Sequence, residues 1–373
     1  MRSKPLVLLA AGGTGGHLFP AEALADVLGR RGLAVELVTD ARAQRYGGAF
    51  PARAIHQIPA ATPSGGSVFA RLKAVVTLGI GTLAALFLLL RLRPAVLVGF
   101  GGYPTVPPVF AASLLGIPTI LHEQNAVMGR ANCFLAGRVS AIARGLPGPK
   151  GGDAAIEAKS TTTGNPVRPK VAEAAKHAYP DAHVEKFHLL VVGGSQGARV
   201  MSDVVPEAIA LLPEAMRQRL AVVQQARGED EARVRQAYAK LGVTAEVASF
   251  FQDLPARMAA AHLVIARAGA STVAELAVIG RPSILVPFPH AIDQDQAANA
   301  AHLAAEGAAT LVAQKDFSPQ WLASALAAAL ADPETLAQKA AAAKRSGIAD
   351  AAERLAELVL RVANLETRHE TAA

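Results

Sequence analysis

The fold is decided by two stretches of sequence, LVLLAAGGTGGH at residues 6–17 and LLVVGGSQGA at residues 189–198. Each is a continuous apolar run, typical of a buried parallel strand, that passes into a glycine-rich turn and then into a helical pattern. The two copies head the two halves of a 373-residue chain. We therefore expect an α/β protein of two Rossmann-like doubly wound domains facing each other across a cleft.

Further apolar runs and helical patterns complete this picture. A helix is predicted from Pro20 to Gly32, another after residue 198 as far as Leu212, and an alanine-rich helical region over Ser318–Leu365. Residues 145–153 and 161–169 are rich in Gly, Pro and Thr, which predicts domains over 1–165 and 166–345. The helix over 346–373 can pack on the second domain or cross back to the first. The expected strands are Leu6–Ala11, Ala34–Thr39, Ala95–Phe100, Thr119–His122, Leu189–Val192 and Leu263–Ala266.

Composition excludes several classes of protein. Hydrophobic residues make up 51% and charged residues 18% of the chain, which excludes a disordered protein. The single cysteine, Cys133, excludes a disulfide framework and a cysteine-built zinc site. A net charge of +7 fits phosphorylated ligands or an anionic membrane. Nucleic-acid binding is weakly supported, because the sequence contains no dense Lys/Arg tract, zinc finger or RNA-binding motif. The first apolar run ends in glycines after six residues, so we expect a strand and a cytosolic protein rather than a signal peptide.

One stretch, residues 74–90, contains no charged residue and lies between basic flanks formed by Arg71, Lys73, Arg91 and Arg93. As a helix its 17 residues would span roughly 26 Å, somewhat less than the ~30 Å hydrocarbon core of a bilayer. Three interpretations remain open: a transmembrane span, a buried core helix, or a helix whose outer face enters the membrane interface. We expect peripheral rather than integral association.

The glycine turns do not match the common nucleotide-binding motifs. A dinucleotide fingerprint beginning at Gly13 would require glycine where Leu18 stands, and no Gly-Lys-Ser/Thr follows for a P-loop. Their shared capability is to bring backbone N–H groups at a helix N-terminus close to an anion. A third such turn, Gly99-Phe100-Gly101-Gly102-Tyr103, ends another expected strand at the edge where open α/β sheets bind ligands.

Two residues next to these turns have both a structural and a chemical interpretation. His17 can pack at the start of its helix or act as a general base toward a hydroxyl group. Glu275 can belong to a capping box with Ser271 or Thr272, or accept hydrogen bonds from a ribose.

Two apparent metal motifs fail or remain weak. HEQN at residues 122–125 lacks the second histidine of a metalloprotease, because Ala126 occupies its place. Asp293-Gln294-Asp295 can hold a metal bound to a diphosphate or simply form a solvated loop. We predict no metal site.

Seven motifs in this order and spacing resemble the MurG family of bacterial N-acetylglucosamine transferases: GGTGGHLFPA, GFGGYPTVPP, HEQNAVMGRAN, TGNPVR, GGSQGA, RAGASTVAEL and DQAANA. The resemblance runs from about residue 6 to residue 303. It implies a GT-B fold, UDP-GlcNAc as donor, and undecaprenyl-diphospho-MurNAc-pentapeptide (lipid I) as acceptor. It further implies inversion at the sugar without a metal or other cofactor, and a peripheral enzyme of peptidoglycan synthesis on the cytoplasmic face of the inner membrane. Cell-wall assembly proteins are further implied partners.

The same resemblance assigns residues. It places the donor against Arg168, Ser195, Gln196, Phe251, Glu275, Gln296 and Asn299, although Asp295 departs from the family's usual residue before Gln296. It places the acceptor and the reacting centre near Thr14, Gly15, Gly16, His17, Asn125 and the turn Gly101-Gly102-Tyr103. His17 becomes the candidate general base, with Asn125 and Glu275 also in the catalytic group, and the basic-flanked apolar stretch becomes a membrane-docking patch.

Three alternatives remain open at this point. A related GT-B transferase could act on another lipid such as diacylglycerol, and a nucleotide-sugar epimerase would convert UDP-GlcNAc with no acceptor. A non-catalytic membrane adaptor would keep the apolar patch but bind no UDP.

Overall fold

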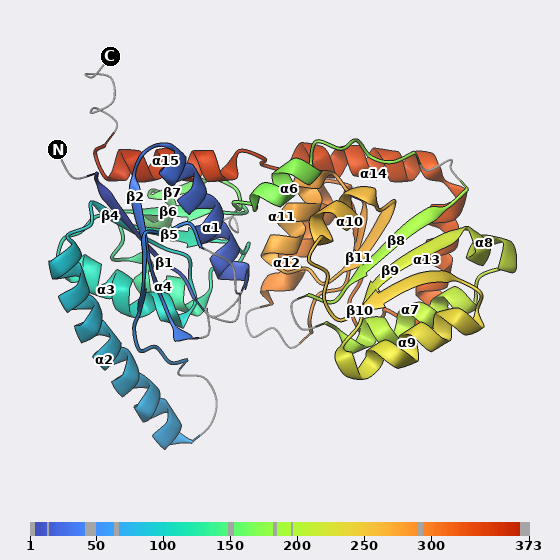
Figure 1. Ribbon diagram of the computed structural model, residues 1–373, viewed down its shortest axis with the longest axis horizontal. Helices are drawn as coiled ribbons and strands as arrows, with labels where there is room; N and C mark the ends of the chain where they lie inside the picture. The colour runs from blue at the N-terminus through green and yellow to red at the C-terminus, as the bar shows by residue number, and fades with distance from the viewer. Residues whose placement is uncertain are drawn as a thin grey trace, which may run out of the picture. The chain divides into compact units, whose positions relative to one another are not determined.

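Two parallel sheets organise the chain, one in each of two units (Figure 1). Unit 1 comprises Met1–Arg168 and Ala349–Ala373, and unit 2 comprises Pro169–Ile348. The computed structural model describes residues 4–12, 15–41, 50–62, 67–147, 153–181, 185–194, 197–289 and 294–365. Each unit is a Rossmann-like α/β domain, which confirms the predicted fold class.

The sheet of unit 1 is parallel throughout, in the order β3-β2-β1-β4-β5-β6-β7. Val7 pairs with Val35 of β2 on one side and with Val96 of β4 on the other. The order in which the strands are added to the sheet therefore reverses at β1. The crevice for a ligand in such a sheet lies beyond the carboxyl ends of the strands at this switch. The strands are β1 (Leu6–Ala10), β2 (Ala34–Thr39), β3 (Ala54–Gln57), β4 (Val96–Gly99), β5 (Thr119–Glu123), β6 (Ala141–Arg144) and β7 (Ser160–Thr162).

Helices cover both faces of this sheet, because successive side chains of β1 point to opposite faces and all of them are buried. Val7 and Leu9 face a core that contains Leu24 of α1 and Leu355 of α15, whereas Leu8 faces the core shared with the other helices. The last helix of the chain, α15, thus packs within unit 1. The helices are α1 (Gly15–Arg30), α2 (Val68–Leu92), α3 (Val106–Leu114), α4 (Arg130–Ala136), α5 (Ala154–Glu157) and α15 (Ala351–Val362), with a 3₁₀ turn over Tyr103–Thr105.

The sheet of unit 2 is also parallel, in the order β10-β9-β8-β11-β12-β13. The order in which its strands are added reverses between β8 and β11. Its strands are β8 (Phe187–Val192), β9 (Leu220–Gln225), β10 (Thr244–Ala248), β11 (Leu263–Ala266), β12 (Ser283–Leu285) and β13 (Ala309–Leu311). Its helices are α6 (Pro169–Ala174), α7 (Arg199–Ala210), α8 (Glu214–Arg219), α9 (Gly228–Lys240), α10 (Leu254–Ala260), α11 (Ala270–Ile279), α12 (Asp295–Ala305), α13 (Pro319–Ala331) and α14 (Pro333–Ser346).

Several boundaries differ from the sequence expectation. Helix α1 begins at Gly15 and contains Pro20, which costs the helix only one hydrogen bond close to its start. Part of the region read as a linker forms β7, which pairs with β6 and completes the sheet. The units divide at Arg168/Pro169 and Ile348/Ala349, against the expected 165/166 and 345/346.

Candidate functional site

In unit 1, the expected acceptor turns meet around His17. Gly15 and Gly16 are the first residues of α1 and His17 the third. The turn after β4 has Gly102 in the left-handed region at φ +76°, and a Cβ added there would lie 3.1 Å from His17 Nε2. Only glycine at position 102 therefore allows this backbone and leaves room for the imidazole ring. Thr14 lies outside the described residues.

Asn125, the second expected residue at the reacting centre, is held by Glu123. The buried Glu123 carboxylate accepts hydrogen bonds from Asn125 N at 3.0 Å, Asn125 Nδ2 at 3.3 Å, Gly129 N at 2.9 Å and Asn132 Nδ2 at 2.8 Å. Burial raises the pKa of Glu123, while these hydrogen bonds act to lower it. The sequence analysis did not assign Glu123 a role, because its burial at the end of β5 is a property of the fold.

His122 was also missed and lies near His17. It is fully buried, its Nε2–H donates to the Gly164 carbonyl oxygen at 3.2 Å, and its ring packs 5.4 Å from that of Phe100. Burial lowers the pKa of His122 to about 4, with a smaller contribution from the nearby His17. At neutral pH it is therefore an uncharged imidazole.

Arg168 is the last residue of unit 1. Its guanidinium carbon lies 4.1 Å from the centroid of the Phe19 ring, within the range of a cation–π contact. Phe19 belongs to α1, so this contact ties the end of the unit to the helix that carries His17. The sequence prediction grouped Arg168 with the second domain.

In unit 2, the second glycine turn follows β8. Gly194 has φ +89° and Gly197 φ +70°, and Gly197 N–H donates to the Gly194 carbonyl at 3.1 Å, which closes the turn. Gly193 N–H donates to Gln225 Oε1 at 3.1 Å, so the end of β9 supports the turn from one side. Ser195 and Gln196, the expected donor residues in this turn, lie outside the described residues.

Glu275 lies in α11, directly beyond β11. The helix is capped at its N-terminus by Gly269, so Glu275 is too far along the helix to form the capping box considered from sequence. Its side chain is nevertheless 7% exposed. Ribose binding by Glu275 remains a prediction.

Side chains of α12 hold the neighbouring loops. The buried Asn299 donates from Nδ2 to the Ala268 carbonyl at 3.2 Å, and Gln296 Oε1 accepts from Phe288 N at 3.0 Å. These contacts position the loops after β11 and β12. The predicted sugar contacts of Gln296 and Asn299 remain predictions.

Phe251 is nearly buried, and the Arg257 guanidinium lies 4.4 Å from the centroid of its ring. Asp295 begins α12, whereas Asp293 lies outside the described residues. Among the residues that the structure describes, no three His, Cys, Asp or Glu side chains group to hold a metal ion.

The apolar stretch forms part of a 25-residue helix, α2, which is mostly exposed. Only Ala74, Gly81, Ala85 and Leu89 are buried, and they form one stripe, which packs mainly against α3. The buried-core-helix interpretation is therefore wrong. By length and composition α2 could cross a membrane, with 17% of its most apolar window buried.

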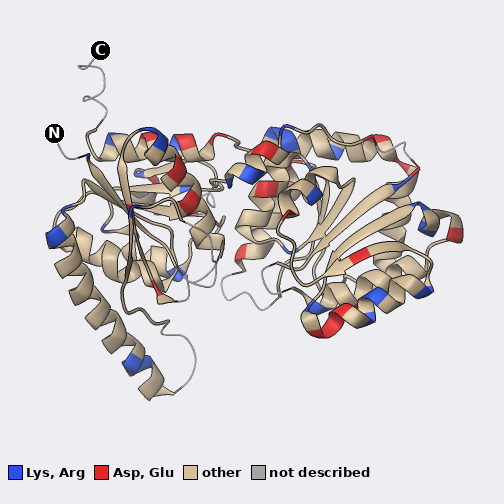
Figure 2. Cartoon of the chain, viewed as in Figure 1, with Lys and Arg blue, Asp and Glu red and all other residues tan. Residues whose placement is uncertain are grey.

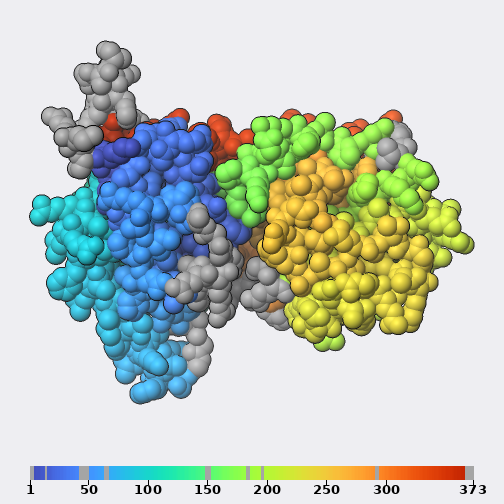
Figure 3. All heavy atoms as spheres, in the orientation of Figure 1, coloured from blue at the N-terminus to red at the C-terminus, as the bar shows by residue number. Residues whose placement is uncertain are grey.

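Helix α2 carries no charged residue between its basic ends (Figure 2). Phe69 is 76% exposed and Phe87 73% exposed. The first turns of α2 stand out at the surface of unit 1 (Figure 3), beyond the helices of the core. We call this surface the α2 face; its other exposed apolar residues are Val68, Leu72, Val75, Val76, Ile80, Leu83 and Leu90.

Comparisons with known proteins agree with this architecture. Residues 7–144 match the glycosyltransferase family 28 N-terminal domain and residues 188–355 its C-terminal domain. The chain is 61% identical over 97% of its length to a protein of Methylobacterium nodulans, of which 98% is covered. It is 58% identical over 99% of its length to one of Brucella suis, of which 97% is covered. Both relatives are named UDP-N-acetylglucosamine–N-acetylmuramyl-(pentapeptide) pyrophosphoryl-undecaprenol N-acetylglucosamine transferase.

Among solved structures, Acinetobacter baumannii MurG superposes with a TM-score of 0.77 at 28% identity, over 96% of this chain and all of that one. A UDP-GlcNAc 2-epimerase from Neisseria meningitidis superposes with a TM-score of 0.67 at 13% identity, over 95% and 100%. The epimerase shares the fold alone. The chain belongs to glycosyltransferase family 28 and has its two-domain GT-B fold.

Proposed function

We propose that this chain transfers GlcNAc from UDP-GlcNAc to the C4 hydroxyl of MurNAc in lipid I, which gives lipid II for peptidoglycan synthesis. The observation that carries the proposal is the identity of 56–61% with transferases of that name over nearly the whole chain. Substrate specificity follows sequence more closely than fold. For this reason the low identity to the epimerase weighs against that alternative.

The donor is assigned to unit 2. Glu275 would accept hydrogen bonds from the ribose hydroxyls, and the backbone near Phe251 would pair with the uracil. The turn Gly193–Gly197, at the N-terminus of α7, suits the diphosphate because its backbone can approach closely and the helix end carries partial positive charge. Ser195, Gln196, Gln296 and Asn299 complete the proposed donor site in unit 2. Arg168, the last residue of unit 1, is proposed to contact the diphosphate.

The acceptor is assigned to unit 1, around Thr14, Gly15, Gly16 and Gly101-Gly102-Tyr103. His17 takes the proton from the C4 hydroxyl as its oxygen attacks the anomeric carbon of GlcNAc and the bond to UDP breaks. Attack opposite the leaving group inverts the configuration. Asn125, fixed by Glu123, orients the acceptor or the sugar. Fixed N–H dipoles and arginines stabilise the diphosphate as it leaves, so the mechanism needs neither a metal nor an organic cofactor.

The α2 face provides the membrane contact. Exposed Phe69 and Phe87 would enter the acyl boundary, while Arg71, Lys73, Arg91 and Arg93 bind lipid phosphates. Because Ala85 and Leu89 remain in the core of unit 1, the helix lies on the bilayer rather than crossing it. We propose a peripheral enzyme on the cytoplasmic face of the inner membrane, where lipid I and cell-wall assembly proteins can be met.

The test offers the full chain labelled UDP-GlcNAc with a short-chain lipid I analogue, with diacylglycerol, or with no acceptor. Label in a lipid-linked disaccharide only with the lipid I analogue supports the proposal. Label on diacylglycerol, or conversion of UDP-GlcNAc without acceptor, would replace it with one of the two other activities.

A further inference from the structure

Arg227 lies against the glycine turn of unit 2, although neither its sequence context nor the family resemblance singled it out. It caps the N-terminus of α9, immediately after β9. A Cβ built on Gly197 would lie 3.1 Å from Arg227 Cγ and 3.4 Å from its backbone N. The aliphatic stem of Arg227 therefore packs on the end of the turn, and glycine at position 197 makes this approach possible.

A second arginine stands on the other side of β8. Arg267 follows β11, and its guanidinium donates to the carbonyls of Val286 and Pro287, both at 3.0 Å, and to Gln314 Oε1 at 2.6 Å. These three partners are uncharged oxygens. Burial and the nearby positive charge of Arg227 lower the pKa of Arg267. Arg227 and Arg267 thus lie on either side of the end of β8, where the strand order reverses.

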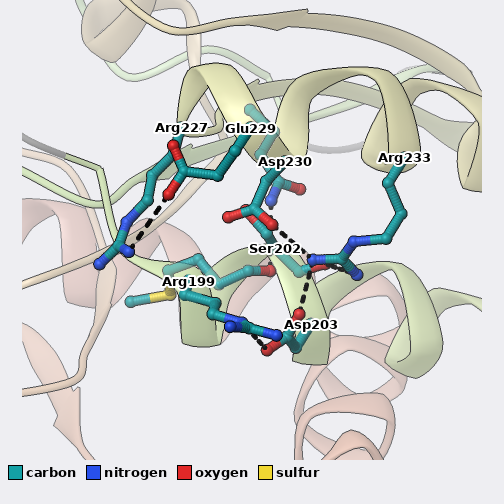
Figure 4. A network of polar contacts seen from close by, with 9 residues as sticks. Arg199, Ser202, Asp203, Arg227, Glu229, Asp230 and Arg233 are labelled. Carbon is teal, nitrogen blue, oxygen red and sulfur yellow. Dashed lines mark hydrogen bonds and ion pairs between the residues drawn. The ribbon is translucent and has the colours of Figure 1, made fainter.

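The ion pair between Arg227 and Glu229 is weak. Its Nη1 lies 3.6 Å from Glu229 Oε1, and the two side chains are 40% and 72% exposed. Exposed pairs of this kind contribute little, so a more highly charged anion can displace the carboxylate. Figure 4 shows the contrast with Arg233, which reaches Asp203 at 2.6 Å and Asp230 at 2.9 Å.

We propose that Arg227 binds the diphosphate of the nucleotide sugar, from the β9 side of the Gly193–Gly197 turn. The inference rests on the proposed donor site in unit 2 and adds a residue to it. The guanidinium at the end of this stem would supply charge-assisted hydrogen bonds to phosphate oxygens, which backbone N–H groups alone cannot match in strength. The bound diphosphate would also relieve the repulsion between Arg227 and Arg267, because its negative charge would lie near both side chains.

The test measures the affinity of the full chain for UDP and for uridine by calorimetry. Arg227→Gln is expected to weaken UDP binding about tenfold or more and to leave uridine binding unchanged. Arg227→Lys keeps the charge and should recover part of the loss. Arg233→Gln, on the same helix but held by Asp203 and Asp230, is the matched control and should bind UDP like the wild type.

Two results would overturn the proposal while leaving the donor site intact: unchanged UDP affinity in Arg227→Gln, or equal weakening of UDP and uridine. The second would assign Arg227 to the nucleoside or to the fold of the turn. Failure of the wild type to bind UDP would instead remove the donor site itself, and with it the proposed function.

Discussion

At the scale of single residues, the chemistry depends on how His17 is placed. Its ring lies beside Gly102 and near the buried, uncharged His122. A well-placed general base contributes about 10²–10⁴-fold to a rate, so His17→Ala should lower kcat by that order. The affinity for UDP should stay nearly unchanged, because the donor is assigned to unit 2. Steady-state kinetics combined with UDP calorimetry check this; loss of UDP affinity with unchanged kcat would make His17 structural.

Glu123 positions Asn125 through its four hydrogen bonds. Glu123→Gln would direct an N–H group at donors such as Gly129 N and should misplace Asn125. A misplacement of this kind can cost about 10²-fold in rate, so kcat should fall by that order while UDP binding persists. Glu353→Gln, an exposed glutamate on α15, is the control. Full activity in Glu123→Gln would show that the network is not needed.

His122 makes the stability of unit 1 depend on pH. The folded state holds the pKa at about 4, against 6.5 in the unfolded chain, so the unfolded chain takes up the proton first as the pH falls. The stabilisation is complete above pH 6.5 and is lost toward pH 4, amounting to about 3 kcal/mol. Denaturant unfolding between these values should show His122→Gln losing less stability than the wild type. Equal losses in both proteins would contradict the assignment.

At the scale of elements, the sequence did not decide whether α2 is buried or exposed. Replacing both Leu83 and Phe87 with serine removes two exposed apolar side chains without touching the buried stripe. Binding to vesicles that contain anionic lipid should weaken about tenfold or more. Activity on a soluble short-chain acceptor should be kept. Phe250→Ser, an exposed aromatic of unit 2, is the control and should bind vesicles normally.

If the double variant binds vesicles as tightly as the wild type, the α2 face is not the membrane contact.

Prediction from sequence succeeded where one local pattern decides an element. Ala34–Thr39 and Leu263–Ala266 are strands with the predicted bounds, because each is a short apolar run with clear ends. It failed where a neighbour decides. Ser160–Thr162 becomes a strand only through its pairing with β6, and α1 begins before Pro20 at glycines that read as a turn.

Burial is the property that sequence could not supply. Arg281 illustrates this, since an arginine is expected at the surface but here is 1% exposed. It donates to the carbonyls of Ala259, Ile279 and Gly280, which end α10 and α11. Glu123 and His122 escaped prediction for the same reason. The motifs located the candidate site, whereas the hydrogen bonds that hold it appear only in the fold.

At the scale of the whole molecule, we assign donor recognition to unit 2, and acceptor and membrane recognition to unit 1. Each unit carries its own glycine turn at the switch point of its own parallel sheet. A diphosphate leaving group stabilised by fixed backbone dipoles and arginine side chains, rather than by a cation, is the claim common to both assignments.

The most direct test follows GlcNAc transfer to a short-chain lipid I analogue in the presence of EDTA, with the anomeric configuration of the product read by NMR. The account predicts unchanged turnover in EDTA and a disaccharide whose new bond has the opposite configuration to the donor. Turnover abolished by EDTA and restored by a divalent cation, or a product that retains the configuration of the donor, would contradict it.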